Sequence, residues 1–275
     1  MLQEKVGYQP PVFEVGLTSR AAPQSHTLRL EVFENEQATT AAAANFLAQE
    51  LQIKPASILL LPTGRTPLLM YAHLVGLVQQ AQLNLSQVQT FNLDEFYGLA
   101  PAHSGSYHTY MQRVLFDHVP IAVRHINLLN GMAFDVVAEC AAYEAKILAV
   151  GGIDVAVLGL GANGHIGFNE PGSPLNSLTR LVTIQPETRA ANAFLFNNQI
   201  EAVPTKALTT GIFTIMQARR IILIATGLSK AQAIAALLYG PVTPELPASC
   251  LRLHPDVTLL VDQKASQEIC QVQTD

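Results

Sequence analysis

Residues 154 to 171, DVAVLGLGANGHIGFNEP, bring together polar side chains that are well suited to moving protons. The run begins as a buried strand, because residues 155 to 158 are apolar without a polar break, and four glycines then crowd the chain. His165 stands between Asn163 and Glu170, and imidazole titrates close to neutral pH. A lone histidine is usually structural. One framed by glycines, an amide and a carboxylate after a strand is predicted to be functional.

The segment GLGANG, residues 159 to 164, also matches the dinucleotide-binding pattern G-x-G-x-x-G. That pattern requires a helix directly after it, whereas HIGFNEP follows here, and Gly167 and Pro171 oppose a helix. No acidic residue stands about 20 residues further on at a strand end, where a ribose would need one. A nicotinamide site is therefore the weaker interpretation of this segment.

A second candidate site is PTGRTP, residues 62 to 67, which joins a short apolar strand to a helix. Thr66 is a good N-cap and a proline suits the first helical turn, so the sequence predicts that a helix begins here. Free backbone N–H groups at such a helix start bind anions, and a merely well-capped helix is the alternative. The turn lacks the lysine and the length of a P-loop, so a triphosphate is not expected. The groups offered to an anion are Thr63, Gly64, Arg65 and Thr66.

An acidic pair and two isolated cations complete the candidates. Asp94 and Glu95 end a predicted strand, where they either cap a turn or supply a general base in the crevice of His165. Arg189 in PETRAAN and Lys206 in PTKALTTG stand out because the chain is poor in cations. Lys206 is predicted at a helix start, where a lysine is slightly unfavourable unless an anion is bound. Solvated surface charges are the alternative for both cations.

The composition predicts a globular protein with a substantial core. The chain has 275 residues, of which 49% are apolar and 13% charged, and a net charge of −5, which argues against nucleic acid or an anionic membrane as partner. Cys140, Cys250 and Cys270 lie far apart, as expected for reduced thiols of a cytoplasmic protein. No HExxH motif or carboxylate-rich cluster suggests a metal, and no signal peptide or membrane span is predicted.

Strands and helices are predicted to alternate along the chain. Such alternation predicts an α/β, Rossmann-like three-layer fold, with a mostly parallel central sheet and helices on both faces. Residues 1 to 25 are predicted to be an N-terminal arm, and residues 26 to 275 a single domain. The long, loosely patterned region 170 to 204 is the candidate lid. Strands are predicted at 28–32, 58–61, 88–93, 155–158, 181–184, 221–226 and 258–262, and helices at 38–52, 68–80, 106–119, 136–150, 205–217 and 230–240.

Several segments occur in one order along the chain and together resemble the glucosamine-6-phosphate deaminases: LPTGRTP, TFNLDEFYGL, INLLNG, GLGANGHIGFNEP, ETRAAN and PTKALTTG. The resemblance covers residues 28 to 262. Related 6-phosphogluconolactonases share the glycine-rich turn and its histidine, but the continuation FNEP is similar to the deaminases. The resemblance implies conversion of glucosamine 6-phosphate to fructose 6-phosphate and ammonia, in amino-sugar catabolism, without metal or organic cofactor.

The resemblance also implies roles for individual residues. Asp94 falls on the base for the enolisation step, His165 on the ring-opening acid and base, and Glu170 on the carboxylate that works with it. Asn163, where many family members have aspartate, would orient His165. The positions expected to hold the sugar phosphate are Thr63, Gly64, Arg189 and Lys206.

The chain departs from the hexameric members of that family at their allosteric site. Ser173 and Arg180 match the family, but Val182 stands where a lysine is expected, so a monomer or small homo-oligomer is predicted in place of a hexamer. Two other functions stay open: a 6-phosphogluconolactonase-type hydrolase, and a sugar-phosphate sensor without enzymatic activity. A sensor of the regulator type would need a helix-turn-helix, for which the N-terminal arm is too short and too uncharged.

Overall fold

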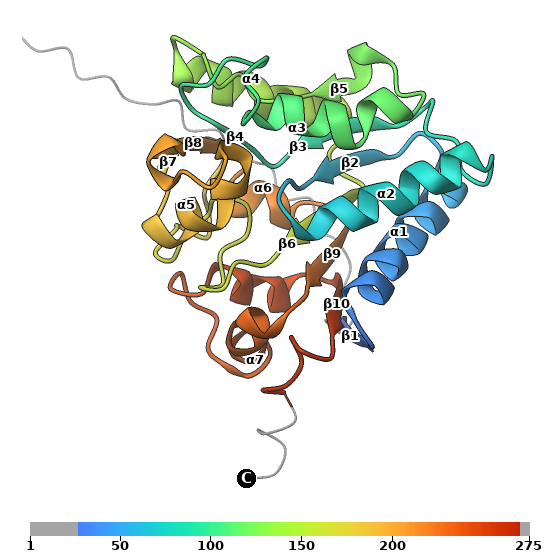
Figure 1. Ribbon diagram of the computed structural model, residues 1–275, viewed down its shortest axis with the longest axis vertical. Helices are drawn as coiled ribbons and strands as arrows, with labels where there is room; N and C mark the ends of the chain where they lie inside the picture. The colour runs from blue at the N-terminus through green and yellow to red at the C-terminus, as the bar shows by residue number, and fades with distance from the viewer. Residues whose placement is uncertain (1–26, 270–275) are drawn as a thin grey trace, which may run out of the picture.

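The computed structural model describes residues 27 to 269, so the predicted N-terminal arm, residues 1 to 25, lies outside the described part. Seven strands form a central sheet in the order β1-β10-β9-β6-β2-β3-β5, and every pairing is parallel (Figure 1). The expected mostly parallel α/β fold is therefore confirmed. The strands are β1 (Thr27–Phe33), β2 (Ile58–Leu61), β3 (Gln89–Asn92), β5 (Ile126–Asn127), β6 (Val155–Gly159), β9 (Arg220–Ala225) and β10 (Asp256–Asp262).

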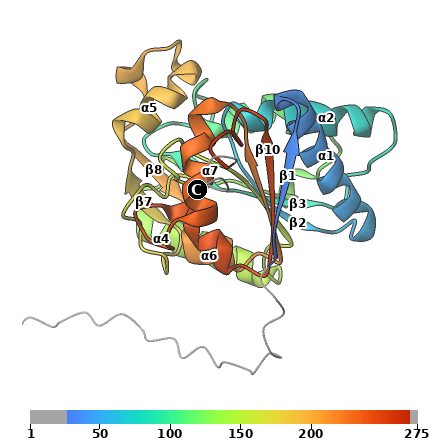
Figure 2. The same cartoon turned by 90° about the horizontal axis from the view of Figure 1, so that it is seen from below.

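Helices cover both faces of this sheet, as the alternating pattern predicts (Figure 2). One apolar cluster joins the sheet to α1, α2 and α3, and the other joins it to α4, α6 and α7. All four residues of β2 are buried, because a strand covered on both faces must be apolar throughout. The helices are α1 (Glu36–Ile53), α2 (Thr66–Gln79), α3 (Tyr107–Val114), α4 (Val136–Ala149), α5 (Pro186–Asn192), α6 (Ile212–Met216) and α7 (Ala231–Tyr239).

A second sheet, antiparallel and three-stranded, was not expected from the sequence. It consists of β4 (Asp94–Phe96), β8 (Lys206–Thr209) and β7 (Arg180–Thr183), with β8 in the middle. The helix predicted over 205–217 is therefore wrong in its first half, and Lys206 begins a strand. Residues 206 to 209 form a strand and not a helix because they pair with two segments that are distant in sequence, β4 and β7.

Two helix starts and ends also differ from the prediction. Thr66 is not the N-cap of α2: Arg65 occupies that position and no side chain caps the helix. The helix predicted over 106–119 ends at Val114 and continues as a 3₁₀ turn, residues 116 to 118. The 3₁₀ segments are η1 (Phe116–His118), η2 (Val123–His125), η3 (Ala193–Phe196), η4 (Ile200–Ala202), η5 (Leu228–Lys230) and η6 (Pro247–Leu253). Between residues 27 and 269, no helix is both long and apolar enough to span a membrane.

The connections define where a crevice opens at the edge of the central sheet. Strand β2 leads into α2 on one face, whereas β9 leads through η5 into α7 on the other face. Strand β6 lies between them. In open parallel sheets, ligands bind at the carboxyl ends of strands whose connections diverge in this way. The carboxyl ends of β2, β6 and β9 are therefore expected to flank the site.

Candidate active site

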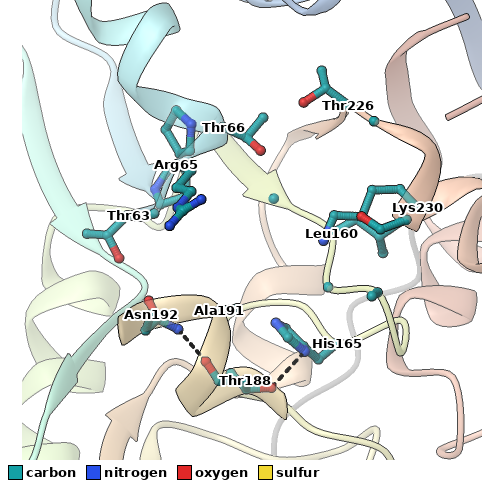
Figure 3. A pocket seen from close by; sticks show the side chains of 18 of the residues that line it. Thr63, Arg65, Thr66, Leu160, His165, Thr188, Ala191, Asn192, Thr226 and Lys230 are labelled. Carbon is teal, nitrogen blue, oxygen red and sulfur yellow. Dashed lines mark hydrogen bonds between the residues drawn. The ribbon is translucent and has the colours of Figure 1, made fainter. Parts of the chain in front are cut away.

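A cavity of about 880 Å³ opens at this edge of the sheet (Figure 3). One wall is the turn before α2, and the loop after β6 carries His165 into the cavity. Asp94, from the second sheet, also lines it. The structure thus brings together three candidate segments that lie far apart in the sequence. The other lining residues include residues 34–37, Glu187, Thr188, Ala191, Asn192, Phe194, Thr226, Gly227, Ser229, Lys230, Asp262 and Lys264.

His165 is held by side chains of its own loop. Its Nδ1 lies 2.7 Å from Oδ1 of Asn163, and Nδ2 of Asn163 donates to Oε2 of Glu170 at 3.0 Å. This amide orientation makes Nδ1 the protonated nitrogen of a neutral His165. Among residues 27 to 269, Nε2 has no hydrogen-bond partner, so it is the nitrogen that can exchange a proton with a ligand. Gly161 makes room for this ring, because a Cβ there would lie 2.2 Å from it.

Glu170 supplies a fixed negative charge behind His165. Burial on its own would raise its pKa, but the bonds and charge of His165, with bonds from Thr188 and Asn163, lower the pKa to about 2. Its Oε2 lies 3.5 Å from Nδ1 of His165, and its Oε1 accepts the backbone N–H of Gln185 at 3.2 Å. Glu170 does not itself line the cavity. Its placement suits stabilisation of an imidazolium rather than contact with a ligand.

Asp94 has the opposite environment. It is 5% exposed, and its nearest donor is the hydroxyl of Thr63, 3.4 Å from Oδ1. Burial, and next the negative charge of Glu95, raise the pKa of Asp94 to about 8, although the Thr63 bond lowers it. A carboxylate that binds a proton this strongly can act as a base toward a weak carbon acid.

The turn before α2 presents hydrogen-bond donors to the cavity. Thr63, Gly64, Arg65 and Thr66 all line the cavity. The helix has no side-chain cap, so no capping side chain accepts the backbone N–H groups of residues 64 to 66, which can donate to an anion. Two tyrosine hydroxyls hold the backbone of the turn in place: Tyr71 donates to the carbonyl of Pro62 and Tyr110 donates to the carbonyl of Gly64, each at 2.6 Å.

Lys230 is a cavity residue that the sequence reasoning missed. It ends η5 and lies across the cavity from Thr66 and Arg65 (Figure 3). Burial lowers the pKa of its ammonium group, and no ion pair holds it within the described part of the chain. A half-buried ammonium group beside free N–H donors is a site for an anionic group such as phosphate.

Arg189 and Lys206 do not line the cavity. The guanidinium of Arg189 donates to the carbonyls of Val203 and Ile200 at 2.8 to 3.0 Å. Lys206 is exposed at the start of β8 and pairs with Thr183. The two cations expected at the sugar phosphate are therefore not among the groups that the structure brings together.

The segment from α5 to η3 lines the cavity and contacts the loop after β6, helix α3 and the turn before α2. Thr188 Oγ1 lies 3.4 Å from His165 Nδ1, and Asn192 accepts the hydroxyl of Tyr107 at 3.0 Å. The guanidinium of Arg65 lies 4.8 Å from the ring centre of Phe194, a cation–π contact. This segment lies within region 170–204, the candidate lid, and its motion stays a prediction.

The sequence of the chain is similar to those of known proteins. A family model described as glucosamine-6-phosphate isomerases/6-phosphogluconolactonase matches residues 34 to 260. The chain belongs to this family. It is 46% identical to the glucosamine-6-phosphate deaminase of Alkaliphilus oremlandii over 237 residues, which is 86% of this chain and 98% of that protein. The corresponding deaminase of Rhodopirellula baltica is 46% identical over 241 residues, covering 88% of this chain and 96% of that one.

Solved structures of the glucosamine-6-phosphate isomerase/6-phosphogluconolactonase family share the fold. A monomeric glucosamine-6-phosphate deaminase superposes with a TM-score of 0.85 and 41% identity, over 88% of this chain and 100% of that chain. The 6-phosphogluconolactonase of Trypanosoma brucei superposes with a TM-score of 0.71 and 19% identity, over 89% and 100%. The resemblance stated from the sequence motifs is thus confirmed.

Potential metal ligands do not cluster in the described part of the chain. Across residues 27 to 269, no group of three or more His, Cys, Asp or Glu side chains could hold a metal ion.

The sequence did carry a signal for Lys230: TGLSKA, residues 226 to 231, follows a buried strand and precedes a helix, just as PTGRTP does. Two strand-to-helix turns at one sheet edge, each with a cation, predict two halves of one anion site.

Proposed function

We propose that this protein is a glucosamine-6-phosphate deaminase that releases ammonia and fructose 6-phosphate. The observation that carries the proposal is one cavity lined by a buried carboxylate of raised pKa, an oriented imidazole and an uncapped helix start. Relatives at 46% identity that cover most of the chain carry this name. The substrate is a closed-ring amino-sugar phosphate.

The phosphate is proposed to bind between the turn before α2 and Lys230. Backbone N–H groups at Gly64 to Thr66, the hydroxyls of Thr63 and Thr66, and the Lys230 ammonium group would surround it. Binding energy from this non-reacting group orients the sugar toward Asp94 and His165. Arg65 can turn from Phe194 toward the phosphate, and Arg189 would join it only if region 170–204 moves.

Ring opening is the step assigned to His165. Nε2 takes the proton of the anomeric hydroxyl and returns it to the ring oxygen as the C1–O5 bond breaks. The imidazolium that forms between these transfers is stabilised by Glu170, while Asn163 holds Nδ1–H. One side chain can perform both transfers because its protonation state is regenerated.

Isomerisation and deamination follow at C2 and C1. Asp94, as carboxylate, takes the C2 proton and returns it to C1, while a second proton passes from the amino nitrogen to O1; together these transfers convert the amino aldehyde into a ketose imine. Water adds to C2 of the imine, the C2–N bond breaks, and ammonia and fructose 6-phosphate leave. A substrate ammonium group beside Asp94 would stabilise the carboxylate form that this step needs.

The test is an assay of the purified protein with glucosamine 6-phosphate and a chelator. Ammonia and fructose 6-phosphate in equal amounts are expected. Hydrolysis of 6-phosphogluconolactone without ammonia release would support the lactonase alternative instead. Tight binding of the sugar phosphate without turnover would support the sensor.

We propose further that the protein is a cytoplasmic monomer without allosteric activation. The solved deaminase that shares this fold at 41% identity is monomeric. Arg180, one residue of the expected activator site, donates to buried Asn169 at 2.8 Å, and Val182 cannot contribute a charge. Light scattering after gel filtration measures the mass, and an assay with added N-acetylglucosamine 6-phosphate should show unchanged, hyperbolic kinetics.

A further inference from the structure

Glu95 follows the proposed base on β4, and no step of the proposed reaction uses it. Its side chain is 1% exposed. Oε1 accepts the backbone N–H groups of Phe96 at 2.8 Å and Tyr107 at 3.0 Å. Oε2 accepts the N–H of His108 at 3.0 Å and lies 2.7 Å from Nδ1 of His108. Hydrogen-bond donors therefore surround both carboxylate oxygens of Glu95.

These bonds tie strand β4 to the first turn of α3. The N–H groups of Tyr107 and His108 belong to that turn, where a carboxylate also interacts favourably with the helix dipole. Helix α3 in turn reaches two parts of the site. Tyr107 lines the cavity and donates to Asn192 of the segment from α5 to η3, and Tyr110 donates to Gly64 of the anion turn.

The INLLNG motif closes the other side of Glu95. A Cβ at Gly131 would lie 3.2 Å from Cγ of Glu95 and 2.3 Å from the carbonyl of Phe96, so only glycine permits this approach. The Gly131 carbonyl also accepts the N–H of Gly98 at 2.8 Å. Glu95 is therefore packed from two sides and shielded from water, which strengthens its electrostatic effect on neighbours.

The other ionisable groups around Asp94 are neutral or belong to the reaction. Three tyrosines, Tyr71 of α2, Tyr107 of α3 and Tyr143 of α4, lie close enough for the charge of Asp94 to raise their pKa further, but burial is the larger cause. Burial also raises the pKa of Tyr110. His165, Arg65 and Lys230 line the same cavity as Asp94 and are assigned to ring opening and phosphate binding. Strand β8 pairs an uncharged residue, Thr209, with Asp94. The carboxylate of Glu95 supplies negative charge beside the base.

We propose that Glu95 is a positioning residue that acts through Asp94. Its buried carboxylate fixes strand β4 to helix α3 and places a negative charge on the residue that directly follows the base in β4. The inference rests on the proposed function only in assigning Asp94 the role of base. The effect on the Asp94 proton equilibrium does not depend on turnover.

Three substitutions separate charge from shape. Glu95→Gln keeps the shape and removes the charge, whereas Glu95→Asp keeps the charge and shortens the reach. His108→Lys, at a side chain that is 25% exposed, keeps a donor to Glu95 and adds a positive charge beside it. Thermal unfolding reports whether each variant folds.

The first measurement is a carbon-13 NMR titration of labelled aspartate in the ligand-free protein, with the Asp94 signal assigned by its loss in Asp94→Asn. We expect Asp94 to titrate about one pH unit lower in Glu95→Gln, a tenfold change in proton affinity, and to move by less, in the same direction, in His108→Lys. Glu95→Asp should titrate close to the wild type. If Glu95→Gln folds and the Asp94 titration is unchanged in it, the inference is overturned. If Glu95→Gln does not fold, an unchanged Asp94 titration in folded His108→Lys overturns the inference.

The second measurement is the pH dependence of kcat for ammonia release. In Glu95→Gln the acidic limb should shift to lower pH with the titration and kcat should fall about tenfold, because the base is weaker. In Glu95→Asp, kcat should fall while the acidic limb of the kcat–pH profile stays at the wild-type pH. Wild-type protein that releases no ammonia would refute the proposed function and leave the NMR result standing. If the wild type releases ammonia but the acidic limb of the kcat–pH profile is at the same pH in Glu95→Gln, this inference is refuted and the proposed function is not.

Discussion

Asp94 and Glu170 are two buried carboxylates at one crevice, yet their pKa values move in opposite directions, to about 8 and about 2. Burial raises the pKa in both places. Asp94 has one long bond, from Thr63, and a negative neighbour. Glu170 has Asn163, Gln185 and His165 around it. The donors around each group, and not burial as such, assign one carboxylate to proton transfer and the other to permanent charge.

The largest test of this comparison is Asp94→Asn. An amide cannot take the C2 proton, so kcat should fall about 10³-fold or more while KM stays within a few-fold. Exchange of the C2 hydrogen with deuterated water, followed by proton NMR, should disappear. Exchange at the wild-type rate would remove Asp94 from its proposed role.

Glu170→Gln is expected to cost less, because His165 keeps its proton-accepting nitrogen. The imidazolium loses its counter-charge, so kcat should fall about 10- to 100-fold. The control is Glu201→Gln, which removes an exposed carboxylate from η4 and should leave kcat unchanged. Equal losses in Asp94→Asn and Glu170→Gln would break the distinction between a base and a fixed charge.

Lys230 is a cation in the same cavity, and burial lowers the pKa of its ammonium group, whereas burial raises the pKa of a carboxylate. In Lys230→Ala, KM should rise about tenfold, since one charged phosphate contact is worth about 1.4 kcal/mol or more, with a smaller change in kcat. Lys206→Ala is the matched control and should leave KM unaltered. A rise in KM for Lys206→Ala alone would restore the assignment drawn from the sequence.

The smallest effects concern stability, and they have opposite signs. The pKa of Asp94 is raised from 3.8, so folding binds a proton and stability falls as pH rises from about 4 to 8. The pKa of Glu170 is lowered from 4.5, so its contribution is present above that pH and is lost as pH falls toward 2. Asp94→Asn should therefore raise Tm by about 2–4 °C at pH 8, and Glu170→Gln should lower it by a similar amount at pH 7. Tm shifts of the same sign would contradict the two environments.

The sequence predicted those parts of the molecule that local chemistry determines. Strands β2 and β6 are continuous apolar runs, and the loop from 159 to 170 carries its own orienting groups, so Asn163, His165 and Glu170 could be recognised together. The turn at 62–67 was identified for the same reason. These features depend on neighbours within a few residues, where spacing carries the information.

Other features could not be read locally. Strand β8 exists because Ala207 and Leu208 pair with β4 and β7, which lie far away in sequence, and the same residues were assigned to a helix. The family resemblance implies that Arg189 holds the phosphate, whereas in the structure its guanidinium donates to the backbone carbonyls of Val203 and Ile200. Burial of Asp94, the largest cause of its raised pKa, also depends on helices from distant segments.

The uncapped start of α2 has a practical consequence for measurements on this protein. Its open N–H groups and Lys230 do not distinguish a sugar phosphate from inorganic phosphate or sulfate by charge alone. Buffers containing these ions should compete with substrate and raise the apparent KM, and should also delay thermal unfolding by linkage. Kinetic constants and melting temperatures are therefore best compared in buffers without oxyanions, and a melting shift on adding phosphate is a rapid report on the integrity of this pocket.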